Sequence, residues 1–234
     1  FSLRRLKNMK PHRKMLNKML DLEQKKEKAV AWFHLLQEEI CSAFVAIEND
    51  APNQSSDLNA GVFVEKIWNR EGGGGGKMRL MNGQIFEKVG VNTSIVHGEL
   101  SEEFRTSIPG AKRDGKFWAA GISVVAHPVN PYVPAAHMNT RFIITSKSWF
   151  GGGADLTPIR PADGQAEKFH AALKKACDNY KKDSYAKFKK WCDDYFYLKH
   201  RDEPRGAGGI FFDSLDNVDW NADFEFIQDV GSTF

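Results

Sequence analysis

The sequence predicts an α+β protein in which one helix precedes a series of strands and further helices follow them. Apolar residues recur at helical spacing between residues 20 and 48, β-like runs with short links occupy residues 63–146, and helical spacing returns after Pro161. Consecutive strands with hairpin-length links favour an antiparallel sheet. We therefore expect helices packed against an antiparallel sheet.

The composition is typical of a globular protein with a real core. Of the 234 residues, 41% are hydrophobic and 12% are aromatic. No apolar run approaches the roughly 18 residues of a membrane span, and no signal-peptide core is recognisable, so we expect an intracellular protein without a transmembrane segment. The cysteines are odd in number, far apart and without CxxC spacing (Cys41, Cys177, Cys192). This pattern argues against a disulfide framework and against a cysteine-based zinc site.

Residues 1–20 form a basic N-terminal leader in this interpretation. The segment contains seven basic residues and no acid, and its leucines and methionines could form an apolar stripe. A nucleic-acid arm, a membrane-surface helix and a transit peptide all have this composition. We favour the simpler reading of a solvated basic segment that precedes the domain.

The first predicted helix covers residues 20–48. Its core-facing stripe consists of apolar residues at helical spacing (Ala29, Trp32, Phe33, Leu36, Ile40, Ala43, Phe44). A loop rich in Asn, Ser, Asp and Pro follows at residues 49–61. Residues 63–68 then predict a strand that leads into five glycines.

A hairpin is predicted around Asn82-Gly83, which joins residues 78–81 to residues 84–89. The preceding glycines, residues 72–76, do not form a phosphate-binding loop. Glu71 stands where that motif needs glycine, and Met78 stands where it needs Ser or Thr. Because these glycines lie between two strands, they suit close backbone approach to a ligand or a tight crossover.

The next two strands, residues 117–126 and 139–146, are the most informative part of the chain. Alternating side chains place Ser123, Val125 and His127 on one face. In the same way, His137, Asn139 and Arg141 share one face of the following run. If the strands are adjacent, a hydroxyl, two imidazoles, an amide and a guanidinium meet in one pocket, which is an inventory for acid/base chemistry and anion binding. Three prolines between the runs predict a rigid connector.

Two later glycine-rich segments each contain a charged residue. Asp155 follows Gly151–Gly153, where it would approach a flat ligand with little obstruction, although a loop aspartate is more often a helix cap or a turn former. Arg205 precedes a second glycine run and an apolar strand at residues 210–212.

Two helices are predicted after Pro161, with apolar stripes over residues 169–180 and 185–196. The basic and aromatic stretch at residues 187–191 suits a solvated helix face better than nucleic acid, because Asp193 and Asp194 offset its charge. Histidines 127, 137, 170 and 200 lack HxxxH spacing, so spacing alone is weak evidence for a metal site.

Four segments together resemble the oxygen-dependent coproporphyrinogen-III oxidases of haem biosynthesis. They are WNREGGGGGKMRLMNGQIFEKVGVNTSIVHG, GISVVAHPVNPYVPAAHMNTRF, WFGGGADLTP and KFKKWCDDYFYLKHRDEPRGAGGIFFD. The resemblance runs from about residue 29 to residue 219 with the motifs in order.

The resemblance implies an α+β fold with a large antiparallel sheet flanked by helices on both faces, assembled as a homodimer. It implies an oxidoreductase that converts two propionates of coproporphyrinogen III to vinyl groups, giving protoporphyrinogen IX with O2 as oxidant and no organic cofactor. Residues 21–234 would be a single oxidase domain lacking the family's C-terminal portion. The expected location is the bacterial cytoplasm, with a mitochondrial one as the alternative. A non-catalytic tetrapyrrole-binding protein is the alternative function.

The same resemblance implies roles for particular residues. His137 would be a proton donor, Asp155 would hold pyrrole N–H groups, and Arg205 would complete the catalytic set. Substrate binding would involve Arg141, whose guanidinium suits carboxylates, together with Ser123, Asn139 and the backbone of Thr140. A divalent metal on His127, His137, His170 and His200 is a further option. That option competes with the proton-donor role, because one imidazole cannot serve both through the same nitrogen.

Overall fold

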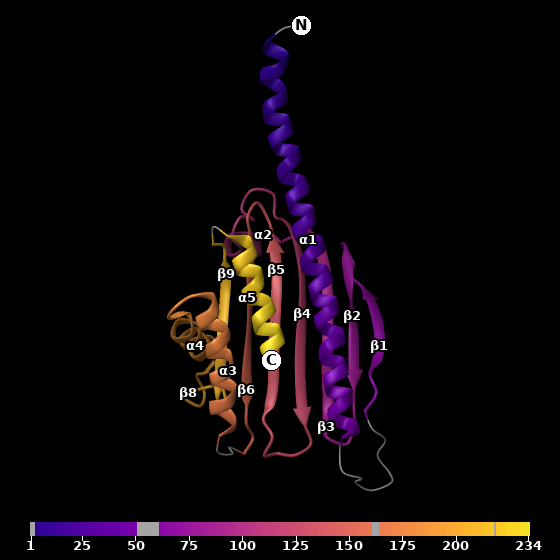
Figure 1. The fold of residues 1–234 in the computed structure, drawn as a ribbon, viewed down its shortest axis with the longest axis vertical. Coiled ribbons are helices and arrows are strands. Elements are labelled where there is room, and N and C mark those ends of the chain that lie inside the picture. Colours follow the sequence, from indigo (N-terminus) through magenta and orange to yellow (C-terminus); the bar gives the residue numbers. More distant parts are fainter. Residues whose placement is uncertain (1–2, 51–60, 161–163, 218) are drawn as a thin grey trace.

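The computed structural model describes residues 3–50, 61–160, 164–217 and 219–234, with the backbone alone for residues 3–16. A long helix, α1 (Leu3–Asn49), precedes a seven-stranded antiparallel sheet in the order β1-β2-β3-β4-β5-β6-β9 (Figure 1). The strands are β1 (Val64–Asn69), β2 (Gly74–Met81), β3 (Phe86–Glu99), β4 (Lys116–Pro128), β5 (Ala135–Ile144), β6 (Ser148–Thr157) and β9 (Gly208–Leu215). The remaining elements are α2 (Glu102–Ser107), α3 (Gln165–Tyr180), α4 (Ser184–Tyr195), β7 (Tyr197–Leu198), β8 (Glu203–Pro204) and α5 (Trp220–Thr233).

The predicted α+β class and antiparallel sheet are confirmed. The helix of residues 20–48, the hairpin around Asn82-Gly83 and the two helices after Pro161 are all present. The loop at residues 49–61 falls largely on residues 51–60, which lie outside the described residues. α1 continues without a break through residue 20, and the division into leader and domain stays a prediction.

One predicted element was wrong. The segment around Gly151–Asp155 is the central part of strand β6, hydrogen-bonded between β5 and β9, and is not a loop. Glycine has a low intrinsic preference for strands, but pairing on both sides outweighs that preference here. A Cβ on Gly152 or Gly153 would come too close to the backbone of a neighbouring strand, which explains why glycine is needed.

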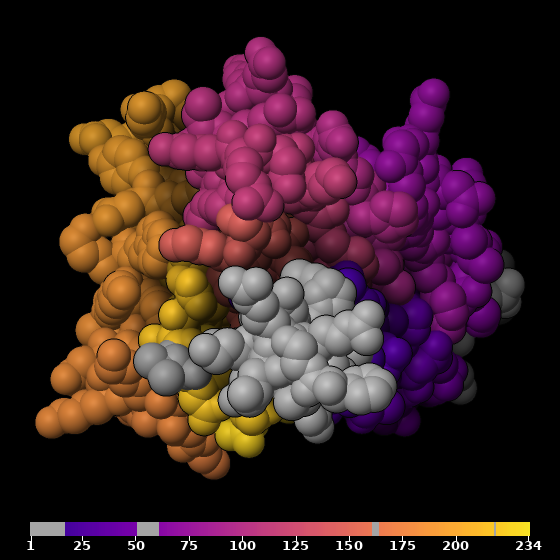
Figure 2. All heavy atoms as spheres, turned by 90° about the horizontal axis from the view of Figure 1, so that it is seen from above, coloured from indigo at the N-terminus to yellow at the C-terminus, as the bar shows by residue number. Residues whose placement is uncertain are grey.

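The core lies between the sheet and helices α1, α3 and α5, on one face of the sheet. In Figure 2 the atoms of α1 (indigo) and of α5 (yellow) lie on the same side of the molecule. Alternate residues of β4 and β5, including Ile122, Val124, Met138 and Phe142, are almost fully buried beneath these helices. Their neighbours in sequence face the other way.

The second face is only partly covered by the described helices. α4 lies along the edge strand β9 and contacts both of its faces: Phe188 packs on Phe212, and Trp191 packs on Phe211. Over β4 and β5 the side chains of this face are partly or fully exposed, Ser123 and Val125 among them. The polar residues that the sequence placed on one face therefore border solvent.

By length and composition, one described helical segment is apolar enough to cross a membrane. It is Asn17–Asn49 of α1, whose most apolar window has a mean hydropathy of 1.3. This finding qualifies the expectation that no such segment exists. Phe33, Leu36 and Ile40 of this segment pack into the core of the protein, and a core helix has the same composition.

Candidate active site

The open face of the sheet brings together residues from four adjacent strands. His137 on β5 lies opposite Val125 on β4 and opposite Asp155 on β6. Asp155 in turn lies opposite Gly209 on β9. Directly opposed residues share a face and have neighbouring side chains, so the sheet register alone places the imidazole beside the carboxylate.

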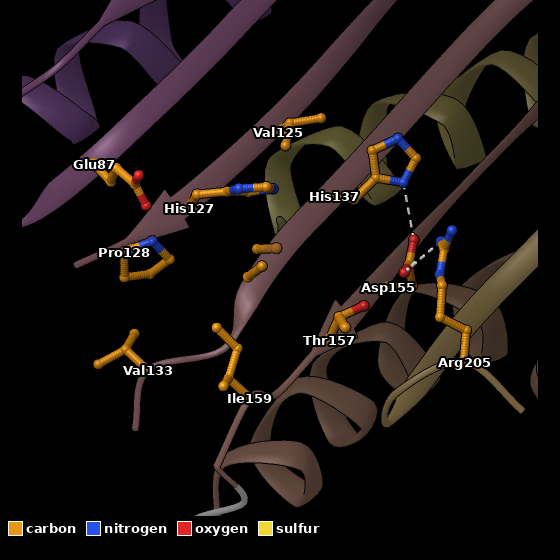
Figure 3. A pocket seen from close by; sticks show the side chains of 12 residues that line it. Glu87, Val125, His127, Pro128, Val133, His137, Asp155, Thr157, Ile159 and Arg205 are labelled. Carbon is orange, nitrogen blue, oxygen red and sulfur yellow. Dashed lines mark hydrogen bonds and ion pairs between the residues drawn. The ribbon is translucent and has the colours of Figure 1, made fainter. Parts of the chain in front are cut away.

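His137, Asp155 and Arg205 form a hydrogen-bonded triad (Figure 3). The Nδ1 atom of His137 lies 2.9 Å from Oδ1 of Asp155, and Nη2 of Arg205 donates to Oδ2 at 2.8 Å. The Asp155 side chain is 4% exposed, whereas those of His137 and Arg205 are about one-third exposed, at 31% and 33%. A buried carboxylate needs such partners, because an unpaired buried charge is strongly unfavourable.

The triad fixes the chemical character of His137. An ionised carboxylate can only accept hydrogen bonds, so Nδ1 of His137 carries a proton. Nε2 is then an acceptor when the ring is neutral and a donor when the ring is charged. Figure 3 shows this second nitrogen pointing away from Asp155. The imidazole can therefore exchange a proton with a ligand on the open face.

The turn that carries Arg205 is held from several sides. Gly206 and Gly208 adopt positive φ angles of 61° and 72°, which favour glycine. The backbone N–H of Ala207 donates to Leu156 on β6 at 3.0 Å. The guanidinium of Arg205 lies over the ring of Phe196, with 3.8 Å between Cζ and the ring centroid.

A cavity of about 430 Å³ opens beside the triad. His127 and Glu87 line its far side, and apolar side chains such as Val125, Val133 and Ile159 line much of the rest. Such a mixture of apolar walls and a few convergent polar groups is usual for small-molecule sites.

A second hollow of about 340 Å³ lies further along the same face, lined by Ser123, Asn139, Thr140 and Arg141. The guanidinium of Arg141 donates to Asn139 at 3.2 Å and lies 3.5 Å from the carboxylate of Asp213. Gly151 on β6 makes this contact possible, because a Cβ there would collide with Asp213. The Thr140 side chain is buried on the helix side, and its backbone lies between β4 and β6 in the sheet, so a hydrogen bond from this backbone to substrate stays a prediction.

The residues that the sequence grouped thus occupy one face but two neighbouring hollows. His127, His137, Asp155 and Arg205 line the first, and Ser123, Asn139 and Arg141 line the second. The expectation of a loop aspartate was wrong, because Asp155 belongs to a strand and is buried. Arg205, which was expected to complete the catalytic set, donates a hydrogen bond to that aspartate.

The four-histidine metal site is not supported. No group of three or more His, Cys, Asp or Glu side chains among the described residues could hold a metal ion. His170 on α3 has both ring nitrogens engaged, with Nε2 3.0 Å from the carbonyl of Ala207 and Nδ1 2.9 Å from the hydroxyl of Tyr185. His200 is exposed in the turn between β7 and β8. His127 and His137 alone share a cavity.

The hydrogen bond between Tyr185 and His170 requires the Tyr185 hydroxyl to keep its proton. A carbonyl only accepts, so Nε2 of His170 donates to Ala207, and Nδ1 of the neutral ring accepts from the Tyr185 hydroxyl. Burial raises the pKa of Tyr185 above its ordinary value, which keeps this hydroxyl a donor. His170 therefore supports the turn that carries Arg205.

Sequence reasoning missed several residues around the site. Phe196 and Tyr185 contribute from α4 and its end, and no spacing rule connects them with Arg205. Asp213 could have been found, because it lies four residues after Gly209 on one strand and therefore on the same face.

Comparisons with known proteins agree with one another. The family model described as Coproporphyrinogen III oxidase matches residues 28–234. A Rickettsia rickettsii (strain Sheila Smith) protein named oxygen-dependent coproporphyrinogen-III oxidase is 56% identical over 208 residues, covering 89% of this chain and 74% of that relative. Proteins of the same name from Rickettsia africae (strain ESF-5) and Rickettsia bellii (strain OSU 85-389) are 57% and 55% identical over 206 residues, each covering 88% of this chain and 74% of the relative.

Proposed function

The chain belongs to the coproporphyrinogen III oxidase family, and from this premise we propose that it oxidatively decarboxylates two propionates of coproporphyrinogen III. The products are the vinyl groups of protoporphyrinogen IX, and O2 is the oxidant, as in porphyrin and haem biosynthesis. The observation that carries the proposal is the buried Asp155 held between His137 and Arg205 on an open sheet face. This triad can exchange protons, and a second guanidinium, that of Arg141, lies on the same face.

Substrate binding rests on charge complementarity. The substrate carries four carboxylates, and guanidinium groups bind carboxylates through paired N–H donors. Arg141 is about one-third exposed, and its contact with Asp213 is loose at 3.5 Å, so it retains donors for a ligand. Ser123 and Asn139 border the same hollow and add hydrogen-bonding groups.

Asp155 is proposed to accept a pyrrole N–H and to favour its deprotonation. A carboxylate offers about four acceptor positions, of which His137 and Arg205 occupy two. Each propionate that becomes a vinyl group loses CO2, one proton and two electrons, and O2 takes up the electrons. An electron-rich pyrrole anion can react with O2 directly, and Nε2 of His137 is placed to exchange the proton.

The proposal also covers the oligomeric state and the cellular location of the protein. We infer a homodimer from the family resemblance, and a bacterial cytoplasmic location, which the bacterial origin of the Rickettsia relatives supports. The edge strand β1 exposes Val64, at 71%, which is consistent with a further contact surface. Analytical ultracentrifugation at several protein concentrations tests the dimer, and a monomer throughout would overturn it.

The decisive experiment supplies the purified chain with coproporphyrinogen III and O2. We expect protoporphyrinogen, detected by fluorescence after oxidation to the porphyrin, together with O2 consumption that depends on substrate. Tight binding of the stable porphyrin without product or O2 consumption would instead identify a non-catalytic tetrapyrrole-binding protein.

A further inference from the structure

We propose that Trp68 and Asn92 form the far wall of the second hollow and contact the bound tetrapyrrole there, Trp68 through its ring and Asn92 through its amide. This inference rests on the proposed function. Both residues line the hollow that contains Ser123, Asn139 and Arg141. Trp68 lies on β1 and Asn92 lies on β3. In the order of the sheet, β3 is two strands and β1 is four strands away from β5, which carries His137.

The sheet register shows why Trp68 can reach this hollow. One row of opposed residues crosses five strands, from Trp68 through Gly76, Ser94 and Gly121 to Arg141. The three residues between the indole and the guanidinium are glycine or serine. With neighbouring strands about 4.8 Å apart, this row forms a shallow trough with an aromatic ring at one end and a cation at the other.

Gly76 leaves room for the indole ring of Trp68, because it has no side chain. A Cβ on Gly76 would lie 2.8 Å from both Cε2 and Cζ2 of Trp68, closer than any real contact. The Trp68 ring therefore lies across strand β2, over a glycine of the five-glycine run, and only partly exposed. This packing assigns one of those glycines a role that no phosphate-binding pattern explained.

Asn92 supplies a polar group without a partner. Its Oδ1 atom is buried, and no hydrogen bond joins its side chain to another residue in the described part of the chain. It lies directly opposite Ser123, whose hydroxyl faces the same hollow. The unpaired Oδ1 atom is an acceptor and is suited to an N–H donor of a ligand, such as a pyrrole N–H. The amide N–H₂ of Asn92, the hydroxyl of Ser123 and the guanidinium of Arg141 can each donate to a ligand carboxylate.

These two residues fit an arm of a tetrapyrrole. Each pyrrole ring is flat and apolar on its faces and bears a carboxylate on a short chain. The indole can pack against the ring while Asn92, Ser123 and Arg141 bind the carboxylate. Because the contact is remote from Asp155 and equal before and during the reaction, it should affect KM rather than kcat.

The test compares Trp68→Leu and Trp68→Phe with Ile67→Ala. Ile67 is the exposed neighbour on the same strand and faces the other side of the sheet, so it is a matched control. The readouts are the Kd for coproporphyrin III, from fluorescence titration, and the steady-state KM and kcat. We expect Trp68→Leu to raise Kd and KM about tenfold with kcat changed less than about twofold, and Trp68→Phe to retain most of the affinity.

A second arm uses Asn92→Asp, which keeps the shape of the side chain but places a negative charge beside the ligand carboxylate. We expect weaker binding than in the wild type, and less weakening as salt is raised. If the wild type turns over substrate while Trp68→Leu or Asn92→Asp binds and reacts as the wild type does, the inference is wrong and the proposed function stands. If the wild type gives no product, the proposed function itself fails.

Discussion

Asp155 holds the candidate site together, and the proposed chemistry depends on it. Its two carboxylate oxygens each bind a different cationic or protonatable partner, and its side chain is nearly buried. A loop aspartate of the kind expected from the glycine run could be replaced with little loss of stability. On a central strand, its removal leaves a guanidinium and an imidazole without their acceptor.

We predict that Asp155→Asn lowers kcat at least about 100-fold, because the neutral amide can neither accept a proton nor hold Arg205 as an ion pair. Asp155→Ala should in addition cost about 1–3 kcal/mol of unfolding free energy. Turnover assays and urea denaturation measure the two effects. Asp194→Asn, at an exposed ion pair on α4, is the control and should change neither. Retention of more than a tenth of the wild-type kcat in Asp155→Asn would contradict the assignment.

His170 acts on the site through the backbone of Ala207, as a positioning residue. We predict that His170→Leu lowers kcat/KM about tenfold, whereas His170→Gln, whose amide can still donate to that carbonyl, keeps most of the activity. Tyr185→Phe should have a smaller effect of the same kind, since it removes the donor to Nδ1. Steady-state kinetics with each variant distinguish this role from metal ligation. Equal losses in His170→Gln and His170→Leu would argue against it.

At the scale of elements, α1 is fastened to the sheet by buried polar contacts as well as apolar ones. Near its C-terminal end, the carboxylate of Glu48 accepts hydrogen bonds from the backbone N–H groups of Gln84, Ile85 and Phe86. Further along, the amide of Gln37 donates to the carbonyls of Lys77 and Val91. The Glu48 contacts order the connection between β2 and β3, and thus the strand that carries Asn92.

We predict that Glu48→Gln lowers the free energy of unfolding by about 2 kcal/mol, because charge-assisted bonds to buried N–H groups are lost and an amide N–H₂ faces those donors. Glu39→Gln, at an exposed position of the same helix, should change it by less than about 0.5 kcal/mol. Urea denaturation followed by circular dichroism provides the measurement. Similar losses in both variants would show that Glu48 does not hold the turn.

At the scale of the whole molecule, one face of the sheet builds the core and the other builds the site. All three cysteines belong to buried regions. Burial raises the pKa of the Cys41 thiol, and it raises those of Cys177 and Cys192 to about 12. For Cys192 the nearby Asp155 carboxylate adds to the effect of burial.

The native protein should therefore react slowly with iodoacetamide at pH 8, because the thiolate is the reactive form and the thiols stay protonated. In denaturant, all three cysteines should be labelled, with the count read by intact mass spectrometry. Labelling in the native state would then report opening of the core. Fast labelling of Cys192 without denaturant would show that the region behind Asp155 is open to solvent.

Local patterns in the sequence were sufficient for much of this architecture. Alternation along β4 and β5 correctly placed Ser123, His137 and Arg141 on one face, because side-chain direction along a strand is a property of the backbone itself. Asn82-Gly83 located the hairpin, and helical spacing located α1, α3 and α4. The function was predicted from the sequence motifs of the family. Composition and residue spacing alone could not have predicted it.

Only the tertiary structure decided which distant residues meet. Asp155 and Arg205 are separated in sequence by two helices. They form an ion pair because β9, which follows Arg205, pairs with β6 at the edge of the sheet, and no local pattern encodes that strand order. The same pairing with β9 explains why the glycine-rich segment around Gly151–Asp155 is a strand. The position of α3 allows His170 to bind the carbonyl of Ala207, in the turn that carries Arg205. The sequence by itself determined the direction of each side chain from its own element. The packing of elements, which depends on contacts between residues far apart in the chain, determined its neighbours.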